Sequence, residues 1–139
     1  MADSPSATDI QAMLDQSPFM SFSGMQVVSV DAEKLQIVIR MEMRSEFERK
    51  AGTGQWHGGP IAALIDVAGD YALVLQTGGG VPTINFRTDY LRPGMNTALT
   101  ATATVRRAGR TVGVVDIDVV DDSGRLVAVG RGCYGMNVG

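Results

Sequence analysis

One segment of the chain, residues 60–76, predicts a helix that is apolar on nearly every side. One side carries apolar residues at spacings of three and four: Ile61, Leu64, Ile65, Ala68, Ala72 and Leu75. The opposite side is apolar too, through Val67, Tyr71 and Val74. Such a helix must be covered nearly all round. We therefore expect a central core helix and, because one thin domain covers only part of it, a second subunit against the remainder.

Strands are predicted on both sides of this helix. Residues 35–43 follow a period of two, which is typical of a half-buried strand, and residues 25–30 form another apolar run. Four more strands are expected after the helix, at residues 82–90, 97–106, 111–120 and 126–134. Short turns at residues 108–110 and 121–124 favour antiparallel hairpins between the last three. This order predicts an α+β fold in which a curved antiparallel sheet wraps around one long helix.

The 139 residues suit one domain with a single core, and nothing in the sequence suggests a second. Residues 1–18 form an N-terminal segment, in which residues 1–8 are expected to be irregular. A short amphipathic helix with Asp9 as its cap is expected next. Residues 18–24 then connect it to the first strand.

Composition and charge argue against several classes of protein. The formal net charge of −3 disfavours nucleic acid as the main partner, and we find no secretory signal at the N-terminus. Asp66 and Asp70 interrupt the longest apolar stretch, which argues against a membrane span. The single cysteine, Cys133, excludes an internal disulfide and lacks the partners of a zinc site. We expect a cytoplasmic protein that binds neither membrane nor metal.

The start of the predicted helix has the features of a site for an anionic oxygen. The only histidine, His57, is followed by Gly58, Gly59 and Pro60. Backbone N–H groups at a helix start lack intrahelical partners, and the helix dipole adds roughly half a positive charge there. Glycine lets a ligand approach the backbone, and proline suits the first helical turn. The alternative interpretation is a tight turn in which His57 is a hydrogen-bonded core residue.

Two carboxylates lie on the same helix. Asp66 is surrounded in sequence by apolar residues, which points to a general base or a nucleophile rather than to a solvated surface group. Asp70 follows one turn later on the same face. We expect Asp70 to line the same cleft or to face solvent rather than to take part in catalysis.

Together these features resemble the hotdog-fold acyl-CoA thioesterases, in particular the branch of the phenylacetate-degradation and 4-hydroxybenzoyl-CoA thioesterases. The resemblance rests on the triplet His57-Gly58-Gly59 and on Asp66 nine positions after the histidine. Three further matches are Gly54, the segment Tyr90-Leu91-Arg92-Pro93, and residues 106–113 with Gly109-Arg110 at their turn. The resemblance extends over residues 19–136.

The resemblance implies a hotdog fold and roles for particular residues. The N–H of Gly58 would polarise the thioester carbonyl, with His57 ordering the loop. Asp66 would act as base or nucleophile, and Thr83 would orient the water. The substrate-binding residues that the resemblance implies are Gly59, Tyr90, Arg107, Gly109 and Arg110, with the two arginines on phosphates of coenzyme A. It implies no metal or redox cofactor, because coenzyme A enters only as part of the substrate.

We interpret the chain as an acyl-CoA thioesterase for a small aromatic or a short- to medium-chain acyl group. A hotdog enoyl-CoA hydratase or dehydratase is an alternative, and it would use His57 itself together with a carboxylate. A non-catalytic acyl-CoA-binding module is another, and it would fit the departure at Ala51, where many relatives carry an asparagine. An assay with acyl-CoA substrates distinguishes the three. A thioesterase releases the thiol, a hydratase hydrates the acyl chain without releasing the thiol, and a binding module binds without turnover.

Helix geometry predicts a site shared between two chains. Gly58 and Asp66 are eight residues apart, so at ~1.5 Å per residue they lie roughly 12 Å apart along the axis. Attack on a carbonyl requires atoms about 3–3.5 Å apart, so the two residues of one chain cannot serve the same thioester. Two helices packed antiparallel across a two-fold axis would bring them together. We expect a homodimer with two shared sites and the further pairing of such dimers into a tetramer, by a face that the sequence does not indicate.

Overall fold

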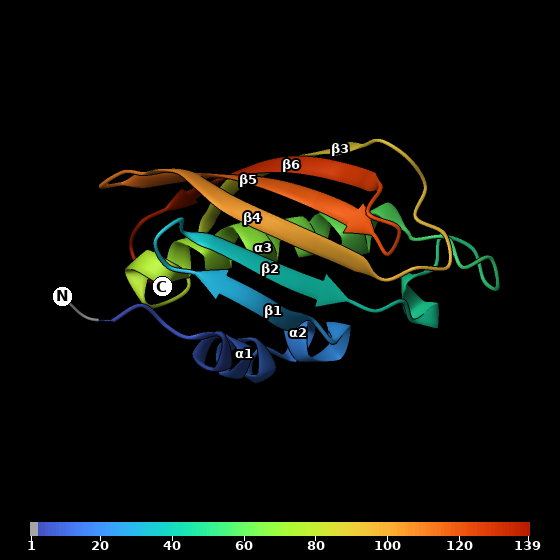
Figure 1. Cartoon of the computed structure of the whole chain (residues 1–139), viewed down its shortest axis with the longest axis horizontal. Coiled ribbons are helices and arrows are strands. Elements are labelled where there is room, and N and C mark those ends of the chain that lie inside the picture. The colour runs from blue at the N-terminus through green and yellow to red at the C-terminus, as the bar shows by residue number, and fades with distance from the viewer. Residues whose placement is uncertain (1–2) are drawn as a thin grey trace.

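Six strands and one long helix form the main body of the structure, a computed structural model that describes residues 3–139 (Figure 1). The N-terminal part holds the short helices α1 (Ala7–Gln16) and α2 (Pro18–Ser23) and the strands β1 (Gln26–Asp31) and β2 (Gln36–Met41). A 3₁₀ turn, η1 (Ser45–Phe47), precedes the long helix α3 (Gly58–Thr77). The remaining strands are β3 (Thr83–Tyr90), β4 (Leu99–Ala108), β5 (Val112–Asp121) and β6 (Leu126–Gly135).

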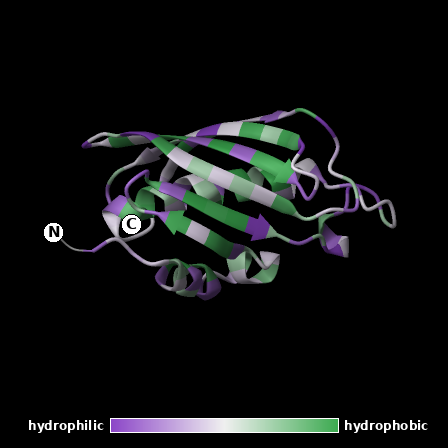
Figure 2. Ribbon diagram, viewed as in Figure 1, coloured by the Kyte–Doolittle hydropathy of each residue, from purple (hydrophilic) through white to green (hydrophobic). Residues whose placement is uncertain are grey.

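All six strands join one sheet in the order β1-β2-β4-β5-β6-β3, and every neighbouring pair is antiparallel. Helix α3 lies along one face of this sheet, against β2, β4, β5 and β6. The register sets buried apolar residues side by side, as in Ile39 opposite Ala101 and Ala103 opposite Ile117. Figure 2 shows hydrophobic and hydrophilic residues alternating along the strands. The predicted α+β arrangement, a sheet wrapped around one helix, is confirmed.

Small residues let α3 approach the sheet closely. A Cβ placed at Gly130 in β6 would lie 2.6 Å from Cγ2 of Ile65 and 2.9 Å from the backbone oxygen of Arg87. Tyr134, fully buried in the same strand, donates a hydrogen bond from its hydroxyl to the carbonyl of Asp66 at 3.0 Å. The helix is thereby fixed against β6 at the level of its first carboxylate.

The start of α1 differs from the prediction. Ser6, not Asp9, is the cap, because the Ser6 hydroxyl accepts the N–H of Asp9 while the Asp9 carboxylate accepts the N–H of Ser6. Residues 7 and 8 are consequently helical rather than irregular. Residues 1–2, which the same prediction covers, lie outside the described residues.

Residues 18–23 form a helix where the sequence predicts only a connection. Ser17 caps this helix α2 with its hydroxyl, Pro18 occupies the first turn, and Gly24 closes it in the left-handed conformation at φ 72°. These local signals suffice for a six-residue helix. Its consequence is that Phe19 is held at the surface, 53% exposed.

The coverage of α3 also differs from the prediction. The sequence predicts that a second subunit covers Val67, Tyr71 and Val74. These three residues are already buried within the single chain. The partly exposed side is instead a stripe of small and acidic residues: Gly59, Ala62, Ala63, Asp66 and Asp70. By length and composition α3 is able to cross a membrane, but most of it is buried inside the fold, as in the core helix of a globular domain.

Strand β3 forms an edge of the sheet with an uncovered apolar face. It pairs with β6 on one side only, and Ile84, Phe86 and Tyr90 are 58%, 38% and 54% exposed. Alternate residues share one face of a strand, and the Tyr90 hydroxyl donates to the carbonyl of Gly58 at 2.7 Å. The apolar face of β3 therefore borders the exposed stripe of α3.

Gly130→Ala is expected to lower the free energy of unfolding by about 1–3 kcal/mol, because the added methyl group would overlap Ile65 and the backbone of Arg87. The matched control is Gly80→Ala, since a Cβ there meets no atom within 4 Å. Urea unfolding followed by circular dichroism measures both variants. Equal stability of the two would contradict the close packing of α3 on β6.

Candidate active site

A capped and anchored loop presents the N–H groups at the start of α3. His57 is the N-cap residue, and its Nδ1 accepts a hydrogen bond from the N–H of Gly59 at 2.9 Å. The N–H of His57 donates to the carbonyl of Phe47 at 2.8 Å, which ties the loop to η1. Within residues 3–139, the N–H of Gly58 has no acceptor. One backbone donor at the positive end of a long helix is thus free for a ligand oxygen.

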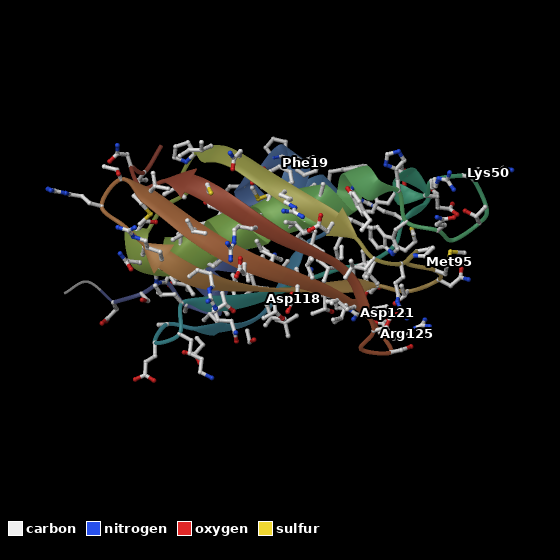
Figure 3. All side chains as sticks on the ribbon, turned by 90° about the horizontal axis from the view of Figure 1, so that it is seen from above. Phe19, Lys50, Met95, Asp118, Asp121 and Arg125 are labelled. Atoms are coloured by element: carbon white, nitrogen blue, oxygen red, sulfur yellow. The ribbon has the colours of Figure 1, made fainter. Side chains whose placement is uncertain are left out.

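A pocket of about 620 Å³, the Gly58 pocket, opens at this helix start. Its lining brings together four residues that the sequence predicts for the site: His57, Gly58, Gly59 and Tyr90. Much of the remaining lining comes from the loop that precedes α3 and from residues 91–94, and it includes the exposed side chains of Arg49 and Arg92. Lys50 follows Arg49 in the sequence and Met95 follows Gly94, and both lie at the same end of the molecule in Figure 3.

Asp66 lies two helical turns further along α3, outside the Gly58 pocket. The Thr83 hydroxyl donates to its Oδ1 at 2.8 Å, and its backbone carbonyl accepts the hydrogen bond from Tyr134. Both partners belong to strands, so the carboxylate is held between α3 and the sheet. Among residues 3–139 its Oδ2 has no hydrogen-bond partner, and the side chain is half-buried. One carboxylate oxygen is thus held in place, and the other is left open.

Asp70, one turn after Asp66, is tied to the backbone. Its Oδ1 accepts the N–H of Val81 at 3.1 Å, which fixes the connection between α3 and β3. Burial raises the pKa of Asp70 from its ordinary value of 3.8 to about 6; the Val81 N–H opposes this shift, and the charge of Asp66 adds to it. Burial also raises the pKa of the adjacent Tyr71. Asp70 therefore anchors the connection between α3 and β3, and burial disfavours its charged form.

The remaining predicted substrate residues are Arg107, Gly109 and Arg110, in the hairpin between β4 and β5. This hairpin lies beside the C-terminal half of α3, since a Cβ at Gly113 would lie 2.7 Å from Leu73. Figure 1 shows the hairpin and the start of α3 at opposite ends of the sheet. A single chain thus holds three separate groups: the donor at the helix start, the carboxylate of Asp66, and the hairpin arginines.

Sequence reasoning missed part of the Gly58 pocket. Arg49 is an exposed loop residue, and no pattern around it marks it as a lining group. Trp56 donates from Nε1 to the carbonyl of Thr97 at 2.9 Å and lines the pocket; its position directly before the only histidine is the signal that could have found it. Ala51 is exposed and does not line the pocket, whereas Gln55 does.

The described residues show no metal-binding constellation. Within residues 3–139, no three His, Cys, Asp or Glu side chains are grouped so that they could hold a metal ion. Cys133 is a free, half-buried thiol in β6. The polar groups that the predicted site residues present are a backbone N–H at Gly58, the carboxylate of Asp66 and the hydroxyl of Thr83.

The sequence matches a known family over more than half of its length. The profile described as Thioesterase superfamily matches residues 53–128. This range contains the start of α3 and the residues Asp66 and Thr83. It also contains the hairpin between β4 and β5.

Individual relatives and a solved structure match most of the chain. It is 34% identical over 122 residues to the acyl-coenzyme A thioesterase PaaI of Escherichia coli, covering 87% of this chain and 84% of that protein. It is 27% identical to the medium/long-chain acyl-CoA thioesterase YigI of E. coli, covering 84% of each. The structure is similar to that of the E. coli PaaI protein from the phenylacetic acid degradation operon, with a TM-score of 0.81, 31% identity, and coverage of 95% of this chain and 92% of that one.

Asp70→Asn is expected to stabilise the protein at neutral pH. The amide keeps an oxygen for the Val81 N–H and removes a charge that burial disfavours. Between pH 3.8 and about 6 the unfolded chain has lost the Asp70 proton and the folded chain has not, so wild-type stability falls as the pH rises through this window. At about 1.4 kcal/mol per pH unit the loss is at most about 3 kcal/mol.

The stability difference between this variant and the wild type should therefore be small near pH 4 and grow to about 1–3 kcal/mol above about pH 7. Urea unfolding of both proteins over this pH range measures the difference at each pH. A difference that stays constant with pH would show that Asp70 does not titrate in this window.

Proposed function

This chain belongs to the thioesterase superfamily, has its hotdog fold and is a thioester hydrolase, and we propose that it cleaves acyl-CoA thioesters of small aromatic or short- to medium-chain acids with Asp66 and the N–H of Gly58. The observation that carries the proposal is the free N–H of Gly58 at the start of α3. A preorganised donor at such a position stabilises a developing oxyanion by about 3–4 kcal/mol. Relatives named as acyl-CoA thioesterases support the substrate class.

In the proposed reaction the thioester oxygen accepts the hydrogen bond from Gly58. Asp66 either takes a proton from a water that attacks the carbonyl carbon, or attacks that carbon itself and forms an anhydride that water then cleaves. In both routes the C–S bond breaks, the sulfur leaves as the thiol of coenzyme A, and one water is consumed to give the acid. Thr83 holds Oδ1 of Asp66, which leaves Oδ2 for the reaction. No metal or redox cofactor takes part in these steps.

The role of His57 favours hydrolysis over hydration of a double bond. Its Nδ1 is engaged by the N–H of Gly59, so the imidazole orders the donor loop. A hydratase mechanism needs the ring itself as the proton carrier at the substrate. The cap gives His57 an ordering role, and the relatives named as acyl-CoA thioesterases support hydrolysis over the hydratase alternative.

The proposed site is complete only when two chains share it. Helix α3 is continuous from Gly58 to Thr77, so Gly58 and Asp66 of one chain are separated by roughly 12 Å along its axis. Two antiparallel α3 helices would set Gly58 of each chain beside Asp66 of the other. The exposed stripe of α3 and the apolar face of β3 support this packing, because the single chain leaves both uncovered. We therefore propose a cytoplasmic homodimer, whose pairing into a tetramer would leave the two sites unchanged.

The same packing gives the hairpin between β4 and β5 a role. It lies beside the C-terminal half of its own α3 and would come close to the start of the partner's helix. Arg107 and Arg110 would then bind the phosphates of the coenzyme A whose thioester is held there. Arg49 and Arg92, in the Gly58 pocket itself, are the competing candidates for these phosphates.

Asp66→Asn is expected to lower kcat by about 100-fold or more, because it removes the base or nucleophile and keeps the shape of the side chain. The dissociation constant for coenzyme A should stay within severalfold of the wild-type value. Thiol release from a panel of aryl- and acyl-CoA substrates measures kcat. Retention of most of the activity, with chemistry shown to be rate-limiting, would remove Asp66 from the mechanism.

The shared site is tested by combining this variant with a second lesion in a mixed dimer. Gly58→Pro removes the donor N–H, and Gly58→Ala is its matched control, because alanine adds the same Cβ near Tyr90 but keeps the N–H. A mixed dimer of Asp66→Asn and Gly58→Pro chains has one site with both lesions and one with none. It should regain about half of the wild-type activity per dimer, while each parent homodimer stays inactive. A folded but inactive mixed dimer would contradict the shared site.

The double variant Arg107→Ala/Arg110→Ala is expected to raise KM for an acyl-CoA about tenfold and to leave KM for the matching acyl-pantetheine thioester nearly unchanged, since that substrate lacks the nucleotide phosphates. The matched control is Arg49→Ala/Arg92→Ala, which removes the same charge from the Gly58 pocket. Steady-state kinetics with both substrates measures the effect. If only the control pair discriminates between the substrates, the phosphates bind at Arg49 and Arg92 instead.

A further inference from the structure

The two carboxylates of α3 accept hydrogen bonds from one short segment of the chain. The N–H of Val81 donates to Oδ1 of Asp70 at 3.1 Å, and the hydroxyl of Thr83 donates to Oδ1 of Asp66 at 2.8 Å. Only Pro82 separates the two donors, and the proline ring fixes the backbone between them. The two carboxylates are therefore held in a fixed relation to each other.

The two side chains are also neighbours on the helix surface. Residues four positions apart on a helix have Cβ atoms about 5–6 Å apart. Asp66 and Asp70 are both half-buried, and both belong to the partly exposed stripe of α3. In each carboxylate Oδ1 accepts a hydrogen bond, and within residues 3–139 Oδ2 accepts none. Two negative charges thus lie one helical turn apart on the side of α3 that the single chain leaves open.

Among the residues that the structure describes, neither carboxylate of this pair forms an ion pair with a cation. The titratable groups that face Asp70 are the Asp66 carboxylate and the Tyr71 hydroxyl of α3 and the Tyr134 hydroxyl of β6. Burial raises the pKa of both hydroxyls, so both stay uncharged near neutral pH. The connection at residues 78–82 has no titratable side chain. The charge of Asp70 therefore acts on Asp66 without a compensating charge.

We propose that Asp70 is a positioning residue that acts through Asp66, because its negative charge makes the Asp66 carboxylate a stronger base or nucleophile. The inference rests on the proposed function, in which Asp66 carries the reaction. In both proposed routes Asp66 gives up negative charge in the transition state, either to a proton or to the carbonyl carbon. A neighbouring negative charge raises the energy of the ionised Asp66 and so lowers the barrier of a step that neutralises it. Asp70 needs no contact with the substrate for this effect.

The same charge works against the stability of the fold. Burial raises the pKa of Asp70 to about 6, so the folded chain disfavours the ionised form that dominates at neutral pH. The anchor alone does not need this charge, because an amide oxygen also accepts the N–H of Val81. Strongly perturbed carboxyl groups are typical of functional sites. An effect on Asp66 therefore accounts for a carboxylate at a position where an amide would give a more stable protein.

The experiment compares kcat of the wild type and of Asp70→Asn between about pH 5 and about pH 8, from thiol release at saturating acyl-CoA. Asp70 loses its proton near pH 6, so wild-type kcat should rise about three- to tenfold across this range as Asp66 becomes more basic. Asp70→Asn keeps the acceptor for Val81 and lacks the charge. Its kcat should match the wild-type value near the acid end of the range and lack the rise.

The matched control is Asp118→Asn, which removes the same charge from the exposed face of β5, at the position labelled in Figure 3. It should keep the wild-type pH profile. In the proposed dimer the partner's His57 would also lie near Asp66, so a rise that persists in Asp70→Asn would belong to that imidazole and would overturn the inference. A decrease by the same factor at every pH would overturn it too, because Asp70 would then act only as an anchor.

A measurement without turnover separates this inference from the proposed reaction. In protein labelled with carbon-13 aspartate, the Asp66 carboxyl signal is assigned by its loss in Asp66→Asn and followed against pH. It should show a second inflection near pH 6 that Asp70→Asn lacks. Identical titrations in the two proteins would overturn the effect of Asp70 on Asp66. If the second inflection is present while Asp66→Asn stays active, the proposed reaction fails and the charge effect between the two carboxylates is supported.

Discussion

Burial of α3 against the sheet is the constraint on which the rest of the structure depends. Eleven of its twenty residues are buried, so this helix forms the centre of the core. The sheet must bend around it and present small residues where the two come closest, as at Gly130 and Gly113. Once the helix is fixed, its N-terminal donor, its carboxylates and the loops at its start have fixed relative positions. The site is thus a property of the core rather than of a mobile surface loop.

The cap of α3 leaves a ligand one donor rather than several. Of the first three helical residues, Gly59 gives its N–H to His57, Pro60 has no N–H, and Gly58 keeps a free one. An oxygen that arrives at this helix start therefore has a single position with good geometry. A donor fixed in this way needs no reorganisation when charge develops on the oxygen, which is what makes such a group effective in a transition state.

Sequence periodicity predicts α3 and the six strands to within two residues, because each is long enough to show its apolar pattern. The six residues of α2 make fewer than two helical turns and show no helical period, whereas six residues of a strand hold three repeats. The choice of Ser6 over Asp9 as cap depends on reciprocal hydrogen bonds that the sequence does not reveal. Within the site, the sequence predicts the helix start from its glycines and proline, and it predicts Asp66 from the apolar residues around it. It misses Arg49, because a pocket wall forms where loops meet and no local pattern records that meeting.

The two carboxylates of α3 differ because different groups face them. Asp70 accepts a fixed backbone N–H, that of Val81, in the connection that leads to β3. This bond sets where β3 begins and hence where Thr83 meets Asp66. Asp70 thus helps to set the position of Thr83, which donates its hydroxyl to Asp66, although burial raises the pKa of Asp70 to about 6. Asp66 receives a hydroxyl from an exposed strand end instead, and this keeps one of its oxygens open to the stripe of α3 that a second chain would cover. One face of this core helix therefore carries two carboxylates in different states: Asp70 is anchored by a backbone N–H of its own chain, and Asp66 keeps one oxygen without a partner among the described residues.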